Sequence, residues 1–146
     1  MKKELIELAR YRLGKAQNTL DDAKKYFENA TLESTVNRIY YAMFYAVNAL
    51  LLTKGLAAAK HSGVRALFNR EFVNTGIVER DQGKFYAEMF DRRQKGDYRD
   101  FVKFEREDVE VWLRKAEEFI DKIEQTTILI IEEKQSPDSI QNNNGQ

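Results

Sequence analysis

The residues best suited to chemistry in this sequence stand together at positions 93–98, which read RQKGDY. The guanidinium of Arg93 is a permanent cation with a forked set of donors, a shape that fits a phosphate group. The phenol of Tyr98 can donate a proton or stack on a nucleobase. Arg92 and Asp97 stand beside these two residues and are expected to help bind the ligand. The segment predicts a small, locally basic site for a phosphate-bearing ligand, with Arg93 and Tyr98 as the residues best placed for chemistry there.

Other common chemistries lack the residues they need. The chain has no cysteine and a single histidine, His61, so thiolate metal sites and cysteine nucleophiles are excluded. A helical di-iron site needs Glu-x-x-His pairs, and a zinc site needs several histidine or cysteine ligands. The sequence contains neither of the glycine-rich phosphate loops, GxxxxGK or GxGxxG. We therefore expect no metal and no cofactor.

Composition restricts the class of protein further. The 146 residues suit one domain, and the 24 basic and 24 acidic side chains cancel, so any basic surface must be local. No apolar run approaches the roughly 20 residues that a membrane span needs. The first residues, MKKE, lead directly into a charged helical pattern without a signal segment. Together with the absence of cysteine, this predicts a cytoplasmic protein with no membrane contact.

The helix predicted over residues 34–54 must lie at the centre of the fold. Apolar side chains recur on it at steps of three and four, and the opposite side also carries large groups instead of a plain charged face. Asn37 and Tyr41 lie on that second side and need hydrogen-bond partners if they are buried. We expect them to form the wall against which Arg93 is placed, because Arg93 continues the inner face of a later helix.

The remaining pattern is helical throughout. Four long helices are predicted over about residues 3–29, 34–54, 78–94 and 105–132, and no stretch alternates with period two over the length of a strand. Thr31 is expected to cap the second long helix and Gly55 to follow its end. Ser62 is expected to cap a shorter helix, and Gly96 to end the fourth long one before a polar loop at 97–100. The fold class is all-α, an up-and-down four-helix bundle with an additional short helix. Residues 1–134 form its single domain, and residues 135–146 form a disordered polar tail.

Four segments resemble the HEPN domain, a small helical family of prokaryotic toxin–antitoxin and defence systems. They are NRIYYAMF at 37–44, KHSG at 60–63, FVNTG at 72–76 and RQKGDY at 93–98. The resemblance covers roughly residues 5–125. It implies a homodimer in which two arginine-bearing helix ends face one cleft. It also implies a minimal nucleotidyltransferase as partner, since similar stand-alone HEPN proteins are often encoded beside one.

The resemblance also implies an activity. In active members, an arginine followed after four to six residues by a histidine carries metal-independent RNA cleavage. Arg93 matches the arginine, but Tyr98 stands in place of the histidine. A phenol with a pKa of about 10 is a poorer base at neutral pH than an imidazole with a pKa of about 6.5. His61 can supply an imidazole if the start of the short helix lies at the cleft.

Three functions therefore remain open. The first is an RNA-directed HEPN protein, either a ribonuclease or a toxin that its nucleotidyltransferase partner restrains. The second is a non-catalytic adaptor that binds a nucleotide or a partner, with Tyr98 as a hydroxyl that the transferase modifies. The third is a purely structural bundle in which Arg93 pairs with Asp97 or with a carbonyl at the helix end.

Overall fold

The computed structural model describes the backbone of residues 1–98 and 103–135, and the side chains of residues 1–95 and 103–135. Within these ranges the chain is helical and contains no strand, which confirms the all-α prediction. The elements are α1 (Lys3–Asn29), α2 (Leu32–Leu52), α3 (His61–Phe68) with a following π-helical turn η1 (Asn69–Val73), α4 (Arg80–Tyr98) and α5 (Arg106–Gln135).

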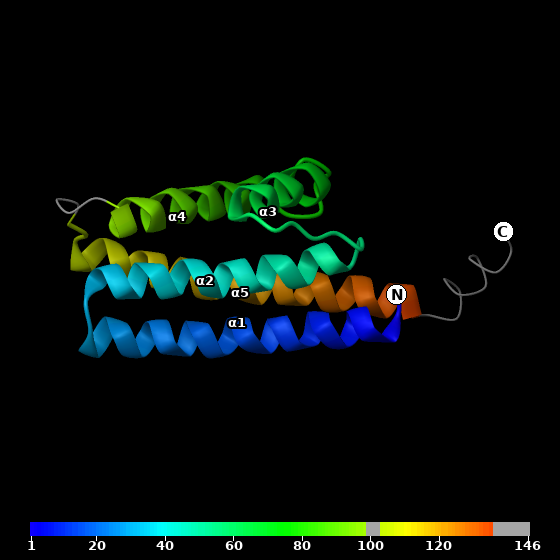
Figure 1. Cartoon of the computed structure of the whole chain (residues 1–146), viewed down its shortest axis with the longest axis horizontal. Coiled ribbons are helices and arrows are strands. Elements are labelled where there is room, and N and C mark those ends of the chain that lie inside the picture. Colours follow the sequence, from blue (N-terminus) through cyan, green and yellow to red (C-terminus); the bar gives the residue numbers. More distant parts are fainter. Residues whose placement is uncertain (99–102, 136–146) are drawn as a thin grey trace, which may run out of the picture.

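The four long helices run antiparallel to their chain neighbours, and α3 lies beside the start of α4 (Figure 1). In this view α1 lies on one side of α2 and α5, and α3 and α4 lie on the other. Helix α2 packs against α1, α3, α4 and α5. This arrangement confirms the bundle with an additional short helix and the central position of α2.

Local sequence signals explain the bounds of α2. The Thr31 hydroxyl accepts a hydrogen bond from the backbone N–H of Ser34 at 3.1 Å, as expected of an N-cap. Past the other end, Gly55 has a φ of 67°, a conformation that favours glycine, and the Leu56 N–H donates to the Leu51 carbonyl at 3.0 Å. The cap and the stop thus lie where the sequence predicts them.

Two predicted helix boundaries are wrong. Helix α3 begins at His61 with Lys60 as its N-cap residue, so Ser62 lies inside the first turn and is not the cap. A cap contributes only about 1 kcal/mol, so packing of the His61 ring on α2 can set an earlier start. Helix α4 continues through Gly96 to Tyr98. A glycine inside a helix costs only about 1 kcal/mol relative to alanine and does not by itself end the helix.

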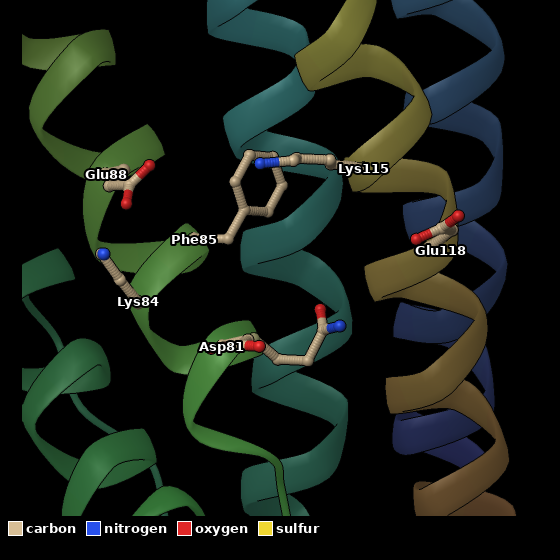
Figure 2. A pocket seen from close by; sticks show the side chains of 7 residues that line it. Asp81, Lys84, Phe85, Glu88, Lys115 and Glu118 are labelled. Carbon is tan, nitrogen blue, oxygen red and sulfur yellow. The ribbon is translucent and has the colours of Figure 1, made fainter.

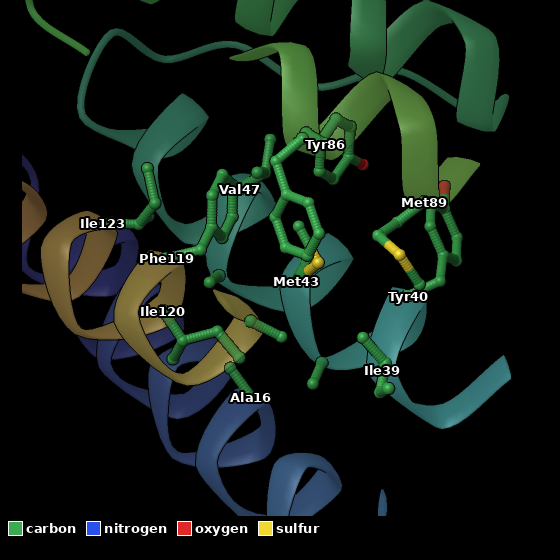
Figure 3. Packing of buried hydrophobic residues seen from close by; sticks show 14 of the residues in the cluster. Ala16, Ile39, Tyr40, Met43, Val47, Tyr86, Met89, Phe119, Ile120 and Ile123 are labelled. Atoms are coloured by element: carbon green, nitrogen blue, oxygen red, sulfur yellow. The ribbon is translucent and has the colours of Figure 1, made fainter. Parts of the chain in front are cut away.

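The core joins α2 to α4 and α5 through large aromatic and sulfur-containing side chains (Figure 3). Tyr86 of α4 stacks on Phe119 of α5, with ring centroids 5.9 Å apart and an angle of 12° between the rings. Tyr40 and Met43 of α2 and Met89 of α4 are fully buried around them. Such close packing restricts the motion of α4 relative to α2, and it fixes the two helices that carry the predicted site.

The end of α5 lies near the predicted domain boundary. The helix ends at Gln135, one residue beyond the expected end of the domain. Residues 136–146 of the predicted tail and residues 99–100 of the predicted loop lie outside the described residues. No helix in the described part of the chain has both the length and the apolar character that crossing a membrane requires.

Candidate functional site

Arg93 points from α4 toward α2, where two tyrosines surround it. Its Nη1 donates to the Tyr41 hydroxyl at 3.5 Å. Its guanidinium carbon lies 4.9 Å from the ring centroid of Tyr40 and 5.7 Å from that of Tyr41. A cation over an aromatic face is attracted by the ring quadrupole, and more so when water is partly excluded. The half-buried guanidinium is thereby held in one place.

His61 lies in the same cluster, although it is the first residue of α3. Its Nδ1 is hydrogen-bonded to the Tyr40 hydroxyl at 2.8 Å. Its ring stacks on Phe44, with centroids 4.3 Å apart and 9° between the rings, and meets Tyr41 edge-on at 5.5 Å. The start of α3 therefore lies beside Tyr40 and Tyr41, the two residues of α2 that contact Arg93. With this placement, His61 can supply an imidazole to the candidate site.

The surroundings set the protonation of both polar rings. Burial lowers the pKa of His61 from its usual value of 6.5, and the positive charge of Arg93 lowers it further. Burial raises the pKa of Tyr40 to about 12, although Arg93 partly offsets this effect. At neutral pH the imidazole is therefore uncharged, and the Tyr40 hydroxyl keeps its proton.

A second arginine extends the cluster along α2. The guanidinium carbon of Arg38 lies 5.1 Å from the ring centroid of Tyr41. Arg38 also donates to the Asn37 Oδ1 from Nε at 3.2 Å and from Nη2 at 2.9 Å. We call the following residues the arginine–aromatic cluster: Arg38, Tyr40, Tyr41, Phe44, His61 and Arg93. An open hollow of about 380 Å³ adjoins it, lined by Asn37, Arg38 and three neighbours.

The other predicted site residues lie elsewhere or outside the description. Arg92 forms an ion pair with Glu88 at 3.3 Å, and its guanidinium carbon lies 4.2 Å from the ring centroid of Trp112 on α5. It is therefore held on the side of α4 that faces α5, apart from the cluster. Asp97 and Tyr98 belong to the last turn of α4, but their side chains are not among those described, so their roles stay predictions.

A separate pocket of about 310 Å³ lies between α4 and α5 (Figure 2). The ammonium of Lys115 lies over the ring of Phe85, 5.6 Å from its centroid. Two lysines and three carboxylates line this pocket, so their charges largely cancel. It contains no residue of the arginine–aromatic cluster and lacks the positive charge that a nucleic-acid backbone attracts.

Three members of the cluster were absent from the predicted site residues: Arg38, Tyr40 and Phe44. A weak signal for Arg38 exists, because it stands one turn before Tyr41 on a helix whose other residues are mostly apolar. Tyr40 shares the apolar face of α2 and resembles an ordinary core residue, with an exposed fraction of 0%. Its contact with His61, 21 positions later, depends on how α3 packs.

Comparison with known proteins agrees with this architecture. A family model described as the HEPN domain matches residues 9–126, most of the helical bundle. The match includes the whole arginine–aromatic cluster. This chain belongs to the HEPN domain family, which confirms the resemblance drawn from its four sequence segments.

Several relatives are similar over most of their length. A Thermotoga maritima protein named UPF0332 protein is 57% identical over 123 residues, which cover 84% of this chain and 91% of that protein. Two Methanocaldococcus jannaschii proteins bear the name "putative toxin". One is 35% identical, and the match covers 83% of this chain and 80% of that protein. The other is 40% identical, and the match covers 74% of this chain and 80% of that protein.

Proposed function

We propose that this chain is a toxin-type HEPN protein that cleaves RNA without a metal ion, in the cytoplasm, with Arg93 as the contact to the scissile phosphate. The family match and two relatives whose names contain the word toxin support the class. The placement of the Arg93 guanidinium between Tyr40 and Tyr41 carries the assignment of the site.

Physical reasons make this arginine suited to a phosphate. A guanidinium is more weakly hydrated than an ammonium and binds phosphate oxygens through paired donors. Partial burial against two rings excludes water and strengthens its attraction to an anion. Arg38 adds a second cation next to Tyr41, and the half-buried rings of Tyr41 and Phe44 offer faces on which a base can stack.

The partners belong to the same proposal. A homodimer would bring two copies of the Arg93 site to one cleft, and a minimal nucleotidyltransferase would restrain the toxin. The family resemblance supports both. Asn37 lines the hollow beside the cluster, where a neighbouring nucleotide would be bound. Tyr98 and Asp97 follow Arg93 by five and four positions on α4 and would approach the same RNA.

Cleavage of a mixed RNA pool in the presence of EDTA tests this function. The wild type is expected to cleave, and Arg93→Ala to lose about 10²-fold or more of the rate, as when one preorganised donor to a developing charge is removed. Arg114→Ala is the matched control, because Arg114 is an exposed arginine of α5 that pairs with Glu110. Equal rates for wild type and Arg93→Ala would contradict the proposal.

The residue at position 98 favours one alternative. Because Tyr98 replaces the histidine of active members, the cluster would bind a nucleotide or partner without cleaving it, and the Tyr98 hydroxyl would accept a group from the transferase. Mass spectrometry after co-expression with a genetically adjacent nucleotidyltransferase checks this. A mass increase absent from Tyr98→Phe, together with inactivity on RNA, would support the adaptor, and an unmodified Tyr98 would count against it.

A further inference from the structure

We propose that His61 is the acid–base residue of the reaction at Arg93, and that Tyr40 positions its imidazole. This inference rests on the proposed RNA cleavage. It assigns the imidazole to a different helix, α3, from the one that carries Arg93. The reaction site would then be assembled from α2, α3 and α4.

The ring of His61 is held on two sides. Phe44 stacks on its face at 4.3 Å, and the Tyr40 hydroxyl binds its Nδ1 at 2.8 Å. Tyr40 is itself fully buried among core residues, so the position of its hydroxyl is defined by the packing. With Nδ1 engaged, Nε2 is the nitrogen that remains to exchange a proton with a ligand. For this role we assign His61 the tautomer in which Nδ1–H donates to the Tyr40 oxygen and Nε2 carries the lone pair.

The charges around His61 favour the form that acts as a base. Tyr40 and Tyr41 face it from α2, and Arg93 acts on it from α4 as a cation. Arg65, one turn later on α3, lies over the ring of Phe90 and pairs with Asp91. Burial and the charge of Arg93 disfavour the imidazolium, so in the assigned tautomer Nε2 carries a lone pair at neutral pH.

The step balances with the groups present and with water. Nε2 takes the proton of a ribose 2′-hydroxyl, and the 2′-oxygen forms a bond to the adjacent phosphorus. The bond between phosphorus and the 5′-oxygen breaks, and that oxygen leaves with a proton from water or from the imidazolium. Arg93 stabilises the charge that develops on the phosphate oxygens. The products are a 2′,3′-cyclic phosphate and a 5′-hydroxyl.

His61→Asn separates this role from binding. Its asparagine keeps a polar group near Tyr40 but has no titratable nitrogen. On an RNA substrate that the wild type cleaves, we expect a rate lower by about 10²–10⁴-fold, the usual contribution of a general base. Affinity for the same RNA, measured by fluorescence anisotropy, should change by less than about threefold, because phosphate contacts dominate affinity. Ser62→Ala, an exposed neighbour in the first turn of α3, is the matched control.

Tyr40→Phe tests the positioning role through the pH profile. Removing the acceptor of the Nδ1 proton should lower the rate about fivefold to tenfold, the effect of one hydrogen bond. It should also shift the acidic limb of the rate profile to lower pH, because the lost bond favoured the imidazolium. If Tyr40 only maintains the fold, its replacement would lower the rate without shifting the acidic limb of the pH profile. Thermal unfolding followed by circular dichroism verifies that both variants fold.

The possible results separate the two proposals. If His61→Asn cleaves at the wild-type rate while Arg93→Ala is inactive, the role of His61 is overturned and RNA cleavage at Arg93 stands. If the wild type binds RNA without cleaving it, both the cleavage and the role of His61 are overturned. Loss of cleavage with retained binding in His61→Asn, and a shifted acidic limb in Tyr40→Phe, would support the inference.

Discussion

At the scale of single residues, His61 connects the proposed chemistry of the cluster to the stability of the fold. Its ring packs against Phe44 and bonds to Tyr40, while burial and the Arg93 charge lower its pKa. The folded chain therefore binds a proton at this position less readily than the unfolded chain does. That difference links proton binding to folding.

The sign of this linkage gives a testable pH dependence. The unfolded imidazole has a pKa of about 6.5, so the contribution of His61 to stability is complete above that value. It is lost as the pH falls below about 6.5 toward the lower pKa of the folded state. Urea unfolding at pH 7.5 and 5.5 should show that stability decreases on acidification. In His61→Asn this decrease should be smaller, and an unchanged decrease would contradict the assigned pKa.

At the scale of elements, α4 carries Arg93 at a position other than the helix end that the sequence predicts. The helix continues to Tyr98, so Arg93 lies more than one turn before its last residue. The interaction of a cation with the helix dipole falls off within the last turn. The dipole therefore contributes little to holding Arg93, and its contacts with the tyrosines of α2 account better for its direction.

The start of α2 offers a prediction about the element that forms the wall of the site. Thr31→Ala removes the hydroxyl that accepts from the Ser34 N–H, and should lower the free energy of unfolding by about 1 kcal/mol. Chemical denaturation measures this change. Thr126→Ala is the control, because its hydroxyl bonds to the Lys122 carbonyl within α5 and alanine is the better helix former. A loss in the control as large as that in Thr31→Ala would show that the cap is not the cause.

At the scale of the whole molecule, the central helix connects the parts of the site. Helix α2 contacts all four other α-helices, and its Tyr40 touches both the His61 ring and the core residue Tyr86. Substitutions at Tyr40 are therefore expected to affect core packing as well as the proposed chemistry. For this reason the pH profile of Tyr40→Phe is more informative than its rate alone.

The family resemblance predicts the assembly state. Sedimentation equilibrium should give a mass of twice 17.1 kDa, the mass of one chain, if two Arg93 sites face a common cleft. The measurement should be made at several protein concentrations, because a weak dimer dissociates on dilution. A mass of one chain at every concentration would mean that a single bundle holds the complete site.

The sequence by itself determined the helical class, the central position of α2, its Thr31 cap and the inward direction of Arg93. These features depend on the local period of 3.6 residues and on short-range hydrogen bonds, which neighbouring residues specify. Predictions failed at Ser62 and Gly96, where a local preference of about 1 kcal/mol competes with longer-range packing. Both errors concern candidate site residues, because α3 begins at His61 and α4 continues past Arg93 to Tyr98.

Only the tertiary structure decided which side chains meet. Arg93 and Tyr41 are 52 positions apart, and Tyr40 and His61 are 21 apart, so no periodicity relates them. Their contacts arise because α3 and α4 both pack on α2, and that packing depends on the whole core and not on any one segment. The same packing turns Arg92 toward Trp112 and Arg93 toward the tyrosines, although the two arginines are adjacent in the chain.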